Sequence, residues 1–458
     1  MKGLQLSKIL LICATFSLFI LSSCRNDVKV APKSAAEYDH SVITEWNNMF
    51  LETERYATGY RPGPAPRALA YIGLANYEAC ASGMDKHKSI AYNYPDLKIP
   101  AVALGAEYHW PTVVNACNGF LMARFFTSME APKFQKILDL EKSLYAKYEA
   151  EVASDVLNRS KQYGQAVASA VWEWSKTDTY GHEAYLDPFG TYDWKSKFKT
   201  DGDWVPTSPN GKPMFPNWGK VRHFAISDAD RLCRAPLKYS TDKTSPLYVQ
   251  ALEVYSQNTP TLSYESEWIG EYWSDDIVNL TFSPGPRWIA IAQQVYDREK
   301  SSLEIALLCN AKIGLSINDA AVACWYSKYQ YNVERPVTYI NRVIDPKWKP
   351  ALTNPLNGAT GVTPSFPAYP SGHSTMGGAA AEALGSVFGY AYAMTDYCHK
   401  GRTEFEGTPR AFDSFKEMAD ENGISRVPLG VHFRMDCQEG VRLGEVCGRK
   451  VNQLAWNR

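Results

Sequence analysis

The sequence lacks any large excess of charge of one sign. Its 458 residues carry 48 Lys and Arg against 49 Asp and Glu, which gives a formal net charge of −1. This balance argues against bulk nucleic-acid binding, which depends on an excess of positive charge. The hydrophobic content of 45% and the charged content of 21% are ordinary for a globular protein. The length suits two domains or one large composite core.

The chain also lacks the C-x-x-C spacing that is typical of structural zinc sites and redox motifs. Its ten cysteines include Cys13 and Cys24 near the N-terminus. The other eight stand at scattered positions, several of them in apolar surroundings where cysteine behaves as a small hydrophobic residue. Export would permit disulfides, but the sequence alone does not pair these cysteines.

Long apolar runs are scarce outside the N-terminus. There, Lys2 and Lys8 precede an apolar run over residues 9–21, which is short for a membrane span and typical of a signal peptide. No other run approaches the length of a transmembrane helix. The chain is therefore not expected to be embedded in a membrane.

The signal ends in a sequence that resembles a bacterial lipobox, Leu21-Ser22-Ser23-Cys24. By that resemblance, residues 1–23 are a lipoprotein signal peptide and Cys24 is lipidated; a plain secretory signal with an incidental cysteine is the alternative. Residues 24–40 are polar and predict a tether. We expect a protein of the bacterial cell envelope that contacts the membrane only through this lipid anchor.

Apolar spacing predicts an all-α fold built of helical bundles. The region 41–247 is predicted as an N-terminal helical region, and 248–458 as a C-terminal helical domain. Within the first, residues 180–247 are rich in Pro, Gly and aromatic residues and predict long irregular loops, with a hairpin at Asn210-Gly211. Such loops form either a functional cover or a structural excursion. The expected helices span 41–58, 133–153, 160–175, 288–296, 303–315, 318–332 and 374–394, with a last helix from near Cys437.

Three ordered motifs in the C-terminal domain contain the candidate chemistry. The first, K-x6-R-P, starts at Lys328 and includes Arg335. The second is Pro370-Ser371-Gly372-His373. The third, S-R-x3-G-x-H-x3-D, includes Arg426, His432 and Asp436.

Together the motifs supply many hydrogen-bond donors and few acceptors. Arg335 and Arg426 offer planar forks that match the oxygens of an oxyanion, and Lys328 adds a point charge. The Ser371 hydroxyl and the Gly372 backbone N–H, at the start of an expected helix, add further donors. The set predicts a site for a tetrahedral oxyanion, either phosphate or vanadate.

The two histidines of the motifs need separate roles. Asp436 follows His432 by four residues, one turn away if the segment is helical, and can accept the proton of one imidazole nitrogen. The other nitrogen is then free to attack phosphorus or to ligate vanadium. His373 is the candidate general acid/base. The remaining histidines lack a partner pattern and are interpreted as surface or structural: His40, His87, His109, His182, His223 and His399.

The three motifs resemble those of the superfamily that unites type 2 phosphatidic acid phosphatases, bacterial acid phosphatases and vanadium-dependent haloperoxidases. The resemblance implies an all-α fold with the anion at the end of one helical bundle. It implies that His432 is the vanadium ligand of a peroxidase or the phosphohistidine nucleophile of a phosphatase, with His373 as acid/base in either. It also implies the residues that bind the anion oxygens: Lys328, Arg335, Ser371, Gly372 and Arg426.

Further details resemble the haloperoxidase branch. Trp325 and Phe366 match aromatic positions around the vanadate of chloroperoxidases. The segment Tyr272 to Asp276 resembles one that supplies an Asp behind the anion-binding residues, best matched by Asp276. Two positions depart from the branch: Glu334 stands where an aromatic residue is common, and Phe433 replaces the usual Trp.

Three functions follow as hypotheses. The leading one is a vanadate-dependent haloperoxidase-like enzyme that oxidises halide with hydrogen peroxide at a vanadate ligated by His432, with Lys328 polarising the bound oxygen. The alternative is an extracytoplasmic acid phosphatase that hydrolyses phosphomonoesters through a phosphohistidine and needs no cofactor. The third is a non-catalytic oxyanion-binding lipoprotein. The choice of halide and the oligomeric state stay open.

Overall fold

The computed structural model describes residues 32–207, 211–257 and 262–458, and Lys33–Arg458 form one compact unit. The signal peptide, residues 24–31 of the predicted tether, Cys24 among them, and Asn210 of the predicted hairpin lie outside the described residues. The helices are α1 (Ser41–Tyr56), α2 (Pro64–Cys80), α3 (Trp110–Phe125), α4 (Ala131–Glu149), α5 (Ser154–Lys176), α6 (Trp194–Lys197), α7 (Pro246–Gln257), α8 (Tyr264–Tyr272), α9 (Arg287–Glu299), α10 (Leu303–Tyr331), α11 (Pro336–Val343), α12 (Gly372–Phe388), α13 (Phe415–Ile424) and α14 (Arg434–Asn452).

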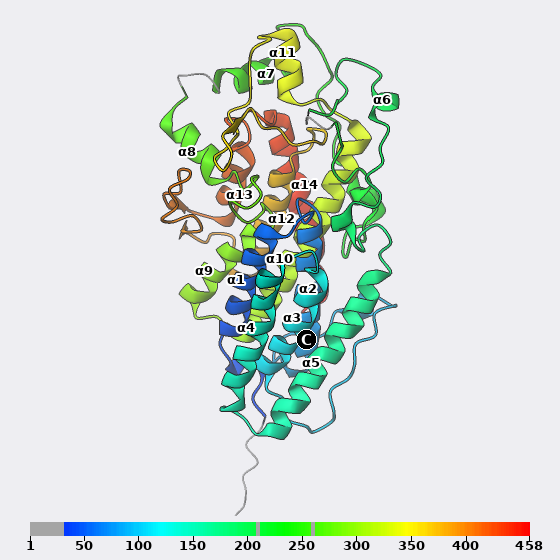
Figure 1. Cartoon of the computed structure of the whole chain (residues 1–458), viewed down its shortest axis with the longest axis vertical. Helices are drawn as coiled ribbons and strands as arrows, with labels where there is room; N and C mark the ends of the chain where they lie inside the picture. The colour runs from blue at the N-terminus through cyan, green and yellow to red at the C-terminus, as the bar shows by residue number, and fades with distance from the viewer. Residues whose placement is uncertain (1–31, 208–210, 258–261) are drawn as a thin grey trace, which may run out of the picture. The chain divides into compact units, whose positions relative to one another are not determined.

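Strands are few and short. In the described part of the chain, β1 (Thr353–Asn354) pairs antiparallel with β2 (Ala359–Thr360), and β3 (Met394–Asp396) pairs antiparallel with β4 (Arg410–Phe412). Helices form the rest of the regular structure (Figure 1). The predicted all-α fold is confirmed.

Helix α10 runs through the core and contacts α2, α12 and α14. It is long and apolar enough to cross a membrane, but 94% of its most apolar window is buried inside the protein. The expectation that no run outside the signal peptide reaches this length was wrong. Because α10 is surrounded by other helices, its apolar character is explained by the core of the protein.

The division of α10 into two predicted helices, 303–315 and 318–332, was also wrong. Ser316 and Asn318 resemble helix-capping residues, but both are fully buried within one continuous helix. The Asn318 side chain donates 3.0 Å to the carbonyl of Arg222. Asn318 therefore binds the segment that covers α10, and neither residue ends the helix.

That covering segment is the predicted loop-rich stretch 180–247. It contains short 3-10 turns and the four-residue α6. The buried carboxylate of Asp319 on α10 accepts hydrogen bonds from the backbone N–H groups of Phe224 (2.7 Å), Ala225 (2.7 Å) and Ile226 (3.1 Å). These bonds fix the stretch to the core helix that leads to Lys328. The predicted boundary at residue 247 stays a prediction, since both regions share the unit Lys33–Arg458.

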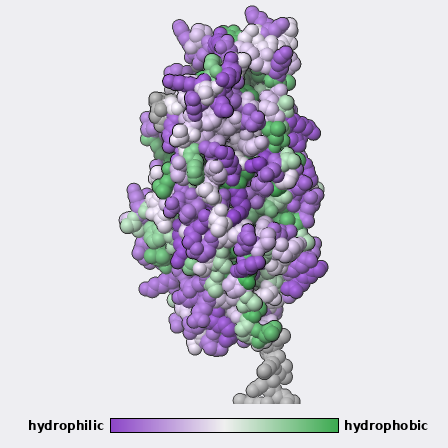
Figure 2. All heavy atoms as spheres, turned by 90° about the vertical axis from the view of Figure 1, so that its right-hand side faces the viewer, coloured by the Kyte–Doolittle hydropathy of each residue, from purple (hydrophilic) through white to green (hydrophobic). Residues whose placement is uncertain are grey.

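One face of the fold shows the character of the surface. Figure 2 shows a face on which hydrophilic side chains predominate and hydrophobic ones lie in small, separate groups, as is normal for a protein surface. The cysteines from Cys80 onward, eight in number, are all free thiols, and seven of them are buried. These eight cysteines therefore form no disulfides with one another, a question that the sequence left open.

Helices α12 and α14 approach so closely that glycine is required between them. A Cβ on Gly444 of α14 would lie 2.0 Å from the carbonyl oxygen of Thr375, and one on Gly378 of α12 would lie 2.4 Å from that of Val441. The obstructing atoms belong to the backbone, so a side chain there would force the helices apart. This contact fixes α12 and α14, whose first turns contain His373 and Asp436.

We predict that Gly444→Ala lowers the free energy of unfolding by about 1–3 kcal/mol, because overpacking against a backbone carbonyl displaces α14 from α12. Urea titration followed by circular dichroism would measure it. Gly270→Ala in α8 is the matched control, since its new Cβ would first meet the side chain of Leu429 at 3.2 Å, which can move. An equal loss of stability in both variants would contradict the close-approach argument.

Candidate active site

The three sequence motifs meet where several helices begin or end. Lys328 lies in the last turn of α10, Arg335 precedes α11, and Ser371 precedes α12. The Lys328 Nζ donates to the carbonyls of Pro367 (2.9 Å) and Ala368 (2.8 Å), just before the second motif. The Ser371 N–H donates 2.9 Å to the carbonyl of Asp436 in the third motif. The structure thus brings the predicted motif residues to one place.

His432 is fixed through one ring nitrogen. Its Nδ1 lies 2.9 Å from Asp436 Oδ2, and the same oxygen accepts a 3.0 Å bond from the Phe433 N–H. Because a carboxylate only accepts, Nδ1 carries the proton and Nε2 keeps its lone pair. His432 lies outside α14, with Phe433 as N-cap. The two residues therefore meet across a helix cap and are not stacked one turn apart within a helix.

Arg335 faces the free nitrogen of His432. Its Nη1 lies 3.2 Å from His432 Nε2 and 2.8 Å from the carbonyl of Val431, and its Nε donates 2.9 Å to the carbonyl of Phe366. Its Nη2 is buried and has no partner among the residues that the structure describes. Burial lowers the pKa of Arg335 to about 9. A fully buried guanidinium with one unpaired nitrogen beside an imidazole lone pair is suited to contact a bound oxyanion.

Lys328 is also buried, and burial lowers its pKa to about 7. Its two backbone contacts leave one N–H of the ammonium group available. The same burial raises the pKa of Asp436 to about 7. Both shifts have the same cause, the removal of these groups from water, and an anion placed between the cations would offset the cost for Lys328.

His373 begins the adjoining helix α12. Ser371 is the N-cap of α12, and its hydroxyl accepts 3.4 Å from the Ser374 N–H. A Cβ on Gly372 would lie 3.3 Å from the ring of Trp325, so only glycine fits there without movement. His373 Nε2 lies 2.8 Å from the carbonyl oxygen of Ser274. Burial, followed by the charge of Arg426, lowers the pKa of His373 to about 4.

Arg426 completes the cationic side of the site. Its Nη2 lies 2.5 Å from Asp276 Oδ2 and its Nη1 lies 3.5 Å from the carbonyl of Ser274. Its buried Nε meets no partner in the described ranges of the chain. The carboxylate of Asp276 also lies 3.9 Å from His373 Nε2. Asp276, the acidic residue expected behind the anion-binding groups, therefore contacts both Arg426 and His373.

An aromatic pair forms one wall. The rings of Trp325 and Phe366 lie 5.0 Å apart. The Phe366 ring lies 5.0 Å from Lys328 Nζ and 4.8 Å from the guanidinium carbon of Arg335. Cations over an aromatic face are held by electrostatic attraction without adding negative charge. The wall therefore orients the cations while leaving their charge available.

Glu334 and Phe433, the two residues that depart from the family pattern, lie beside the site, and their side chains contact other residues. Glu334 accepts 2.6 Å from Arg342 and 2.9 Å from the Thr338 hydroxyl, and burial raises its pKa to about 7. Phe433 is fully buried, and its ring packs edge-on against Tyr339 with centroids 6.2 Å apart. In the described part of the chain, no hydrogen bond or ion pair joins either side chain to Lys328, Arg335 or Arg426.

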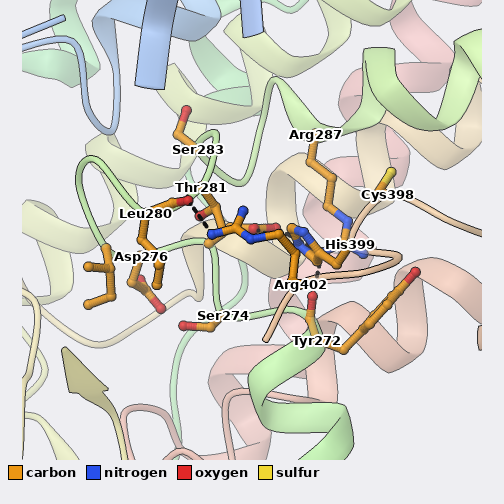
Figure 3. A network of polar contacts seen from close by, with 12 residues as sticks. Tyr272, Ser274, Asp276, Leu280, Thr281, Ser283, Arg287, Cys398, His399 and Arg402 are labelled. Atoms are coloured by element: carbon orange, nitrogen blue, oxygen red, sulfur yellow. Dashed lines mark hydrogen bonds and ion pairs between the residues drawn. The ribbon is translucent and has the colours of Figure 1, made fainter. Parts of the chain in front are cut away.

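Sequence reasoning missed a cluster behind the site. Hydrogen bonds join four buried residues there: Asp275, Arg287, Asp396 and His399. Arg61, from the N-terminal region, donates to the carbonyl of Ile277, in the loop that contains Asp275. His399 was interpreted as surface or structural, and it is a buried member of this cluster (Figure 3). No spacing relates these residues, which are far apart in the chain. The only sequence signal was the position of Asp275 next to Asp276.

The geometry defines a class of protein: a helical protein with a buried oxyanion site of two arginines, a lysine and two histidines. The family model described as the VCPO second helical-bundle domain matches residues 309–457. The curated vanadium chloroperoxidase of Curvularia inaequalis is 24% identical over 489 residues, covering 87% of this chain and 80% of the relative.

Solved structures agree. The first bacterial vanadium-dependent iodoperoxidase superposes with a TM-score of 0.77 at 28% identity, covering 90% of this chain and 96% of that one. A holo-type bacterial vanadium-dependent chloroperoxidase shares the fold with a TM-score of 0.64 at 15% identity, covering 92% of this chain and 98% of that one. The chain is therefore similar to the vanadium haloperoxidases in its C-terminal helical-bundle domain and in its fold, as the resemblance of its motifs predicted.

We predict that Asp436→Asn weakens the binding of inorganic vanadate by about 10–100-fold, because the amide no longer fixes the charge and tautomer of His432. Isothermal titration calorimetry would measure the dissociation constant. Glu334→Gln is the matched control, a buried carboxylate next to Arg335 that contacts only Arg342 and Thr338. Its affinity should stay within about twofold of the unchanged protein, and unchanged affinity in Asp436→Asn would contradict the assigned role.

We also predict that sulfate binding weakens as the pH rises through about 7. The depressed pKa of Lys328 means that its ammonium form, which attracts the anion, is present below this pH and lost above it. Sulfate suits the measurement because its own charge is constant over this range. In Lys328→Gln, affinity should be low throughout and this step should become much smaller, leaving only the part due to Asp436, whose pKa is raised to about 7. A step of unchanged size in Lys328→Gln would show that Lys328 is not its main cause.

Proposed function

We propose that this protein catalyses the peroxide-dependent oxidation of halide with vanadate bound at His432. The observation that supports this most directly concerns His432 Nε2, which carries no proton and, among the described residues, meets only Arg335 Nη1. In the same site the buried Nη2 of Arg335 and Nε of Arg426 have no partner among those residues. Buried donors without partners are costly, and an oxyanion would satisfy them. The residues therefore fit a tetrahedral oxyanion such as vanadate.

Each residue of the site has a definable task in this reaction. His432 Nε2 is the proposed ligand of vanadium, and Asp436 holds the ring in the tautomer that leaves this nitrogen free. Arg335, Arg426, Lys328, Ser371 and the Gly372 N–H would bind the anion oxygens. When bound, vanadate supplies a Lewis acid that activates hydrogen peroxide towards halide without a change in its oxidation state.

His373 is the general acid/base in this proposal. A carbonyl can only accept, so the contact with Ser274 assigns the proton of the neutral ring to Nε2 and leaves Nδ1 as an acceptor. Because burial keeps the ring neutral at neutral pH, Nδ1 can take a proton from hydrogen peroxide as it enters. Lys328 would place positive charge against the oxygen that the halide attacks.

Two observations support the peroxidase reaction over other anion chemistry. The relatives that match most of this chain are named as vanadium chloroperoxidase and vanadium-dependent iodoperoxidase. The Trp325–Phe366 wall beside the cations is the aromatic arrangement expected for that branch. The halide is left open, because the named relatives differ in the halide that they oxidise.

A second candidate is phosphomonoester hydrolysis through a phosphohistidine. The free Nε2 of His432, with Nδ1 fixed by Asp436, is also the arrangement of an imidazole nucleophile. His373 would then protonate the leaving oxygen. This reaction would require no cofactor.

The location of the reaction is proposed from the N-terminal sequence. The signal-like residues 1–23 and the lipobox-like Cys24 favour an exported lipoprotein of the bacterial cell envelope. The substrates would then be small molecules that reach this compartment, hydrogen peroxide with a halide or, for the second candidate, a phosphomonoester.

A paired assay separates the candidates. One arm supplies vanadate, hydrogen peroxide and bromide or iodide and follows halogenation of a phenolic dye; the other omits vanadate and follows hydrolysis of p-nitrophenyl phosphate. We expect halogenation that falls to background in His432→Ala, because the vanadium ligand is lost. Glu334→Gln serves as the control and should keep the activity.

Other outcomes have distinct meanings. Hydrolysis that vanadate inhibits, without halogenation by either halide, would replace the peroxidase proposal with the phosphatase candidate. Vanadate binding without turnover in either arm would favour a binding protein.

A further inference from the structure

A loop over residues 274–283, between α8 and α9, supports two residues of the site from behind. The Ser274 carbonyl oxygen lies 2.8 Å from His373 Nε2 and 3.5 Å from Arg426 Nη1. The carboxylate of Asp276 lies 2.5 Å from Arg426 Nη2. The orientation of His373 and Arg426 therefore depends on where this loop holds its backbone.

We propose that Asp275, Arg287, His399 and Arg61 are positioning residues that hold this loop so that His373 and Arg426 face the anion. We name these four residues the loop clamp. The inference rests on the proposed function only where it takes the anion to be the catalytic cofactor. The role of the loop clamp in positioning His373 and Arg426 is argued from the geometry of the anion-free protein.

Asp275 is the central residue of the clamp. It adopts a φ of +40°, in the left-handed region that residues with a Cβ rarely occupy. The residue is 2% exposed, with Oδ2 2.9 Å from Arg287 Nη1 and Oδ1 3.1 Å from His399 Nε2. Strained backbone of this kind persists only where surrounding contacts enforce it. The carboxylate contacts supply that enforcement.

The conformation of Asp275 determines the direction of the Ser274 carbonyl. That carbonyl and the Asp275 N–H belong to one planar peptide unit, so the φ of Asp275 sets how the plane is turned relative to the anchored Asp275 side chain. Release of the side chain would let the plane rotate and move the carbonyl away from His373 Nε2. The clamp would thus control which ring nitrogen of His373 carries the proton.

Arg287 joins the loop to two other elements. Its Nη1 also donates 2.5 Å to the carbonyl of Tyr272 at the end of α8, and its Nη2 lies 2.9 Å from Asp396 Oδ2 on β3. The guanidinium stacks on Trp273, 3.9 Å from the ring centroid. The arginine is fully buried, so it fixes Asp275 against a rigid frame.

Arg61 grips the loop from the N-terminal region. Its Nη1 donates to the carbonyls of Ile277 (3.2 Å) and Asp275 (3.4 Å), and its Nη2 donates to that of Thr281. Its Nε lies 3.2 Å from Glu54 Oε1. These bonds hold the loop backbone at three carbonyls, one of them that of Asp275. The N-terminal region thereby contributes to a site whose motif residues all lie in the C-terminal domain.

The test uses the full chain and the variants Asp275→Ala and Asp275→Asn. Asparagine tolerates the left-handed region and keeps an acceptor but loses the charge, whereas alanine loses both. The matched control is Asn279→Ala in the same loop, at a φ of +70° with an exposed side chain. It imposes a similar backbone penalty on the loop and leaves the clamp intact.

The first readout is the ¹⁵N NMR signature of His373 in the anion-free protein, assigned with His373→Gln. We expect one ring tautomer, protonated at Nε2, in the unchanged protein and in Asn279→Ala. We expect a mixture of tautomers in Asp275→Ala and an intermediate result in Asp275→Asn. Thermal melting recorded alongside reports any general loss of stability, which by itself would not move the tautomer.

The second readout is vanadate affinity by calorimetry, expected to weaken by about tenfold in Asp275→Ala and to change by less than about twofold in Asn279→Ala. The clamp is refuted by unchanged tautomer and affinity in Asp275→Ala, or by equal changes in Asn279→Ala. If Asp275→Ala does not fold, the His373 tautomer and the vanadate affinity of Asp275→Asn test the clamp instead. Absence of vanadate binding in the unchanged protein would instead refute the proposed function, while the NMR result still tests the clamp.

Discussion

The function of the buried cationic site depends on how few carboxylates lie next to its cations. Lys328, Arg335 and Arg426 are at most 1% exposed. Among the described residues, neither Lys328 nor Arg335 forms an ion pair within 4 Å, and their hydrogen bonds go mainly to backbone carbonyls. Carbonyls orient a cation without cancelling its charge, so the cost of burying these groups is only partly offset. An oxyanion would supply the missing charge and the missing acceptors together.

The helical frame holds the buried cations in place. The site residues stand at helix ends, where backbone groups are not consumed by the helix itself, and the carbonyls that receive Lys328 and Arg335 come from the connecting segments. The close glycine contact between α12 and α14 holds the starts of those helices together. Behind them, the loop clamp fixes the backbone that meets His373 and Arg426. Rigid supports of this kind keep the donors aimed before any anion arrives, which is the condition for strong electrostatic stabilisation.

Much of the site was predictable from sequence because its residues occur in short, ordered motifs. In the structure the charged residues of K-x6-R-P and S-R-x3-G-x-H-x3-D lie at or next to helix ends. The all-α class followed from apolar spacing. The error in α10 has a physical reason: Ser316 and Asn318 resemble caps locally, and only the tertiary structure shows that the covering segment uses Asn318 as a hydrogen-bond donor.

The loop clamp was not predictable in the same way. Arg61, Asp275, Arg287 and His399 come from four distant parts of the chain, and their relation exists only after the loop has folded against α9 and β3. The left-handed backbone of Asp275 has no sequence signature either, since aspartate is common in ordinary turns. The detailed orientation of His373, unlike its identity, therefore required the structure.

The most direct test of the account is a crystal structure of the protein soaked with vanadate. The account predicts vanadium at bonding distance from His432 Nε2, with its oxygens contacted by Arg335 Nη2 and Arg426 Nε, the two buried nitrogens that lack partners in the free protein. Vanadate bound elsewhere, or a vanadate-saturated crystal in which these nitrogens stay unpaired, would contradict the claim that the buried charges exist to hold an oxyanion at His432.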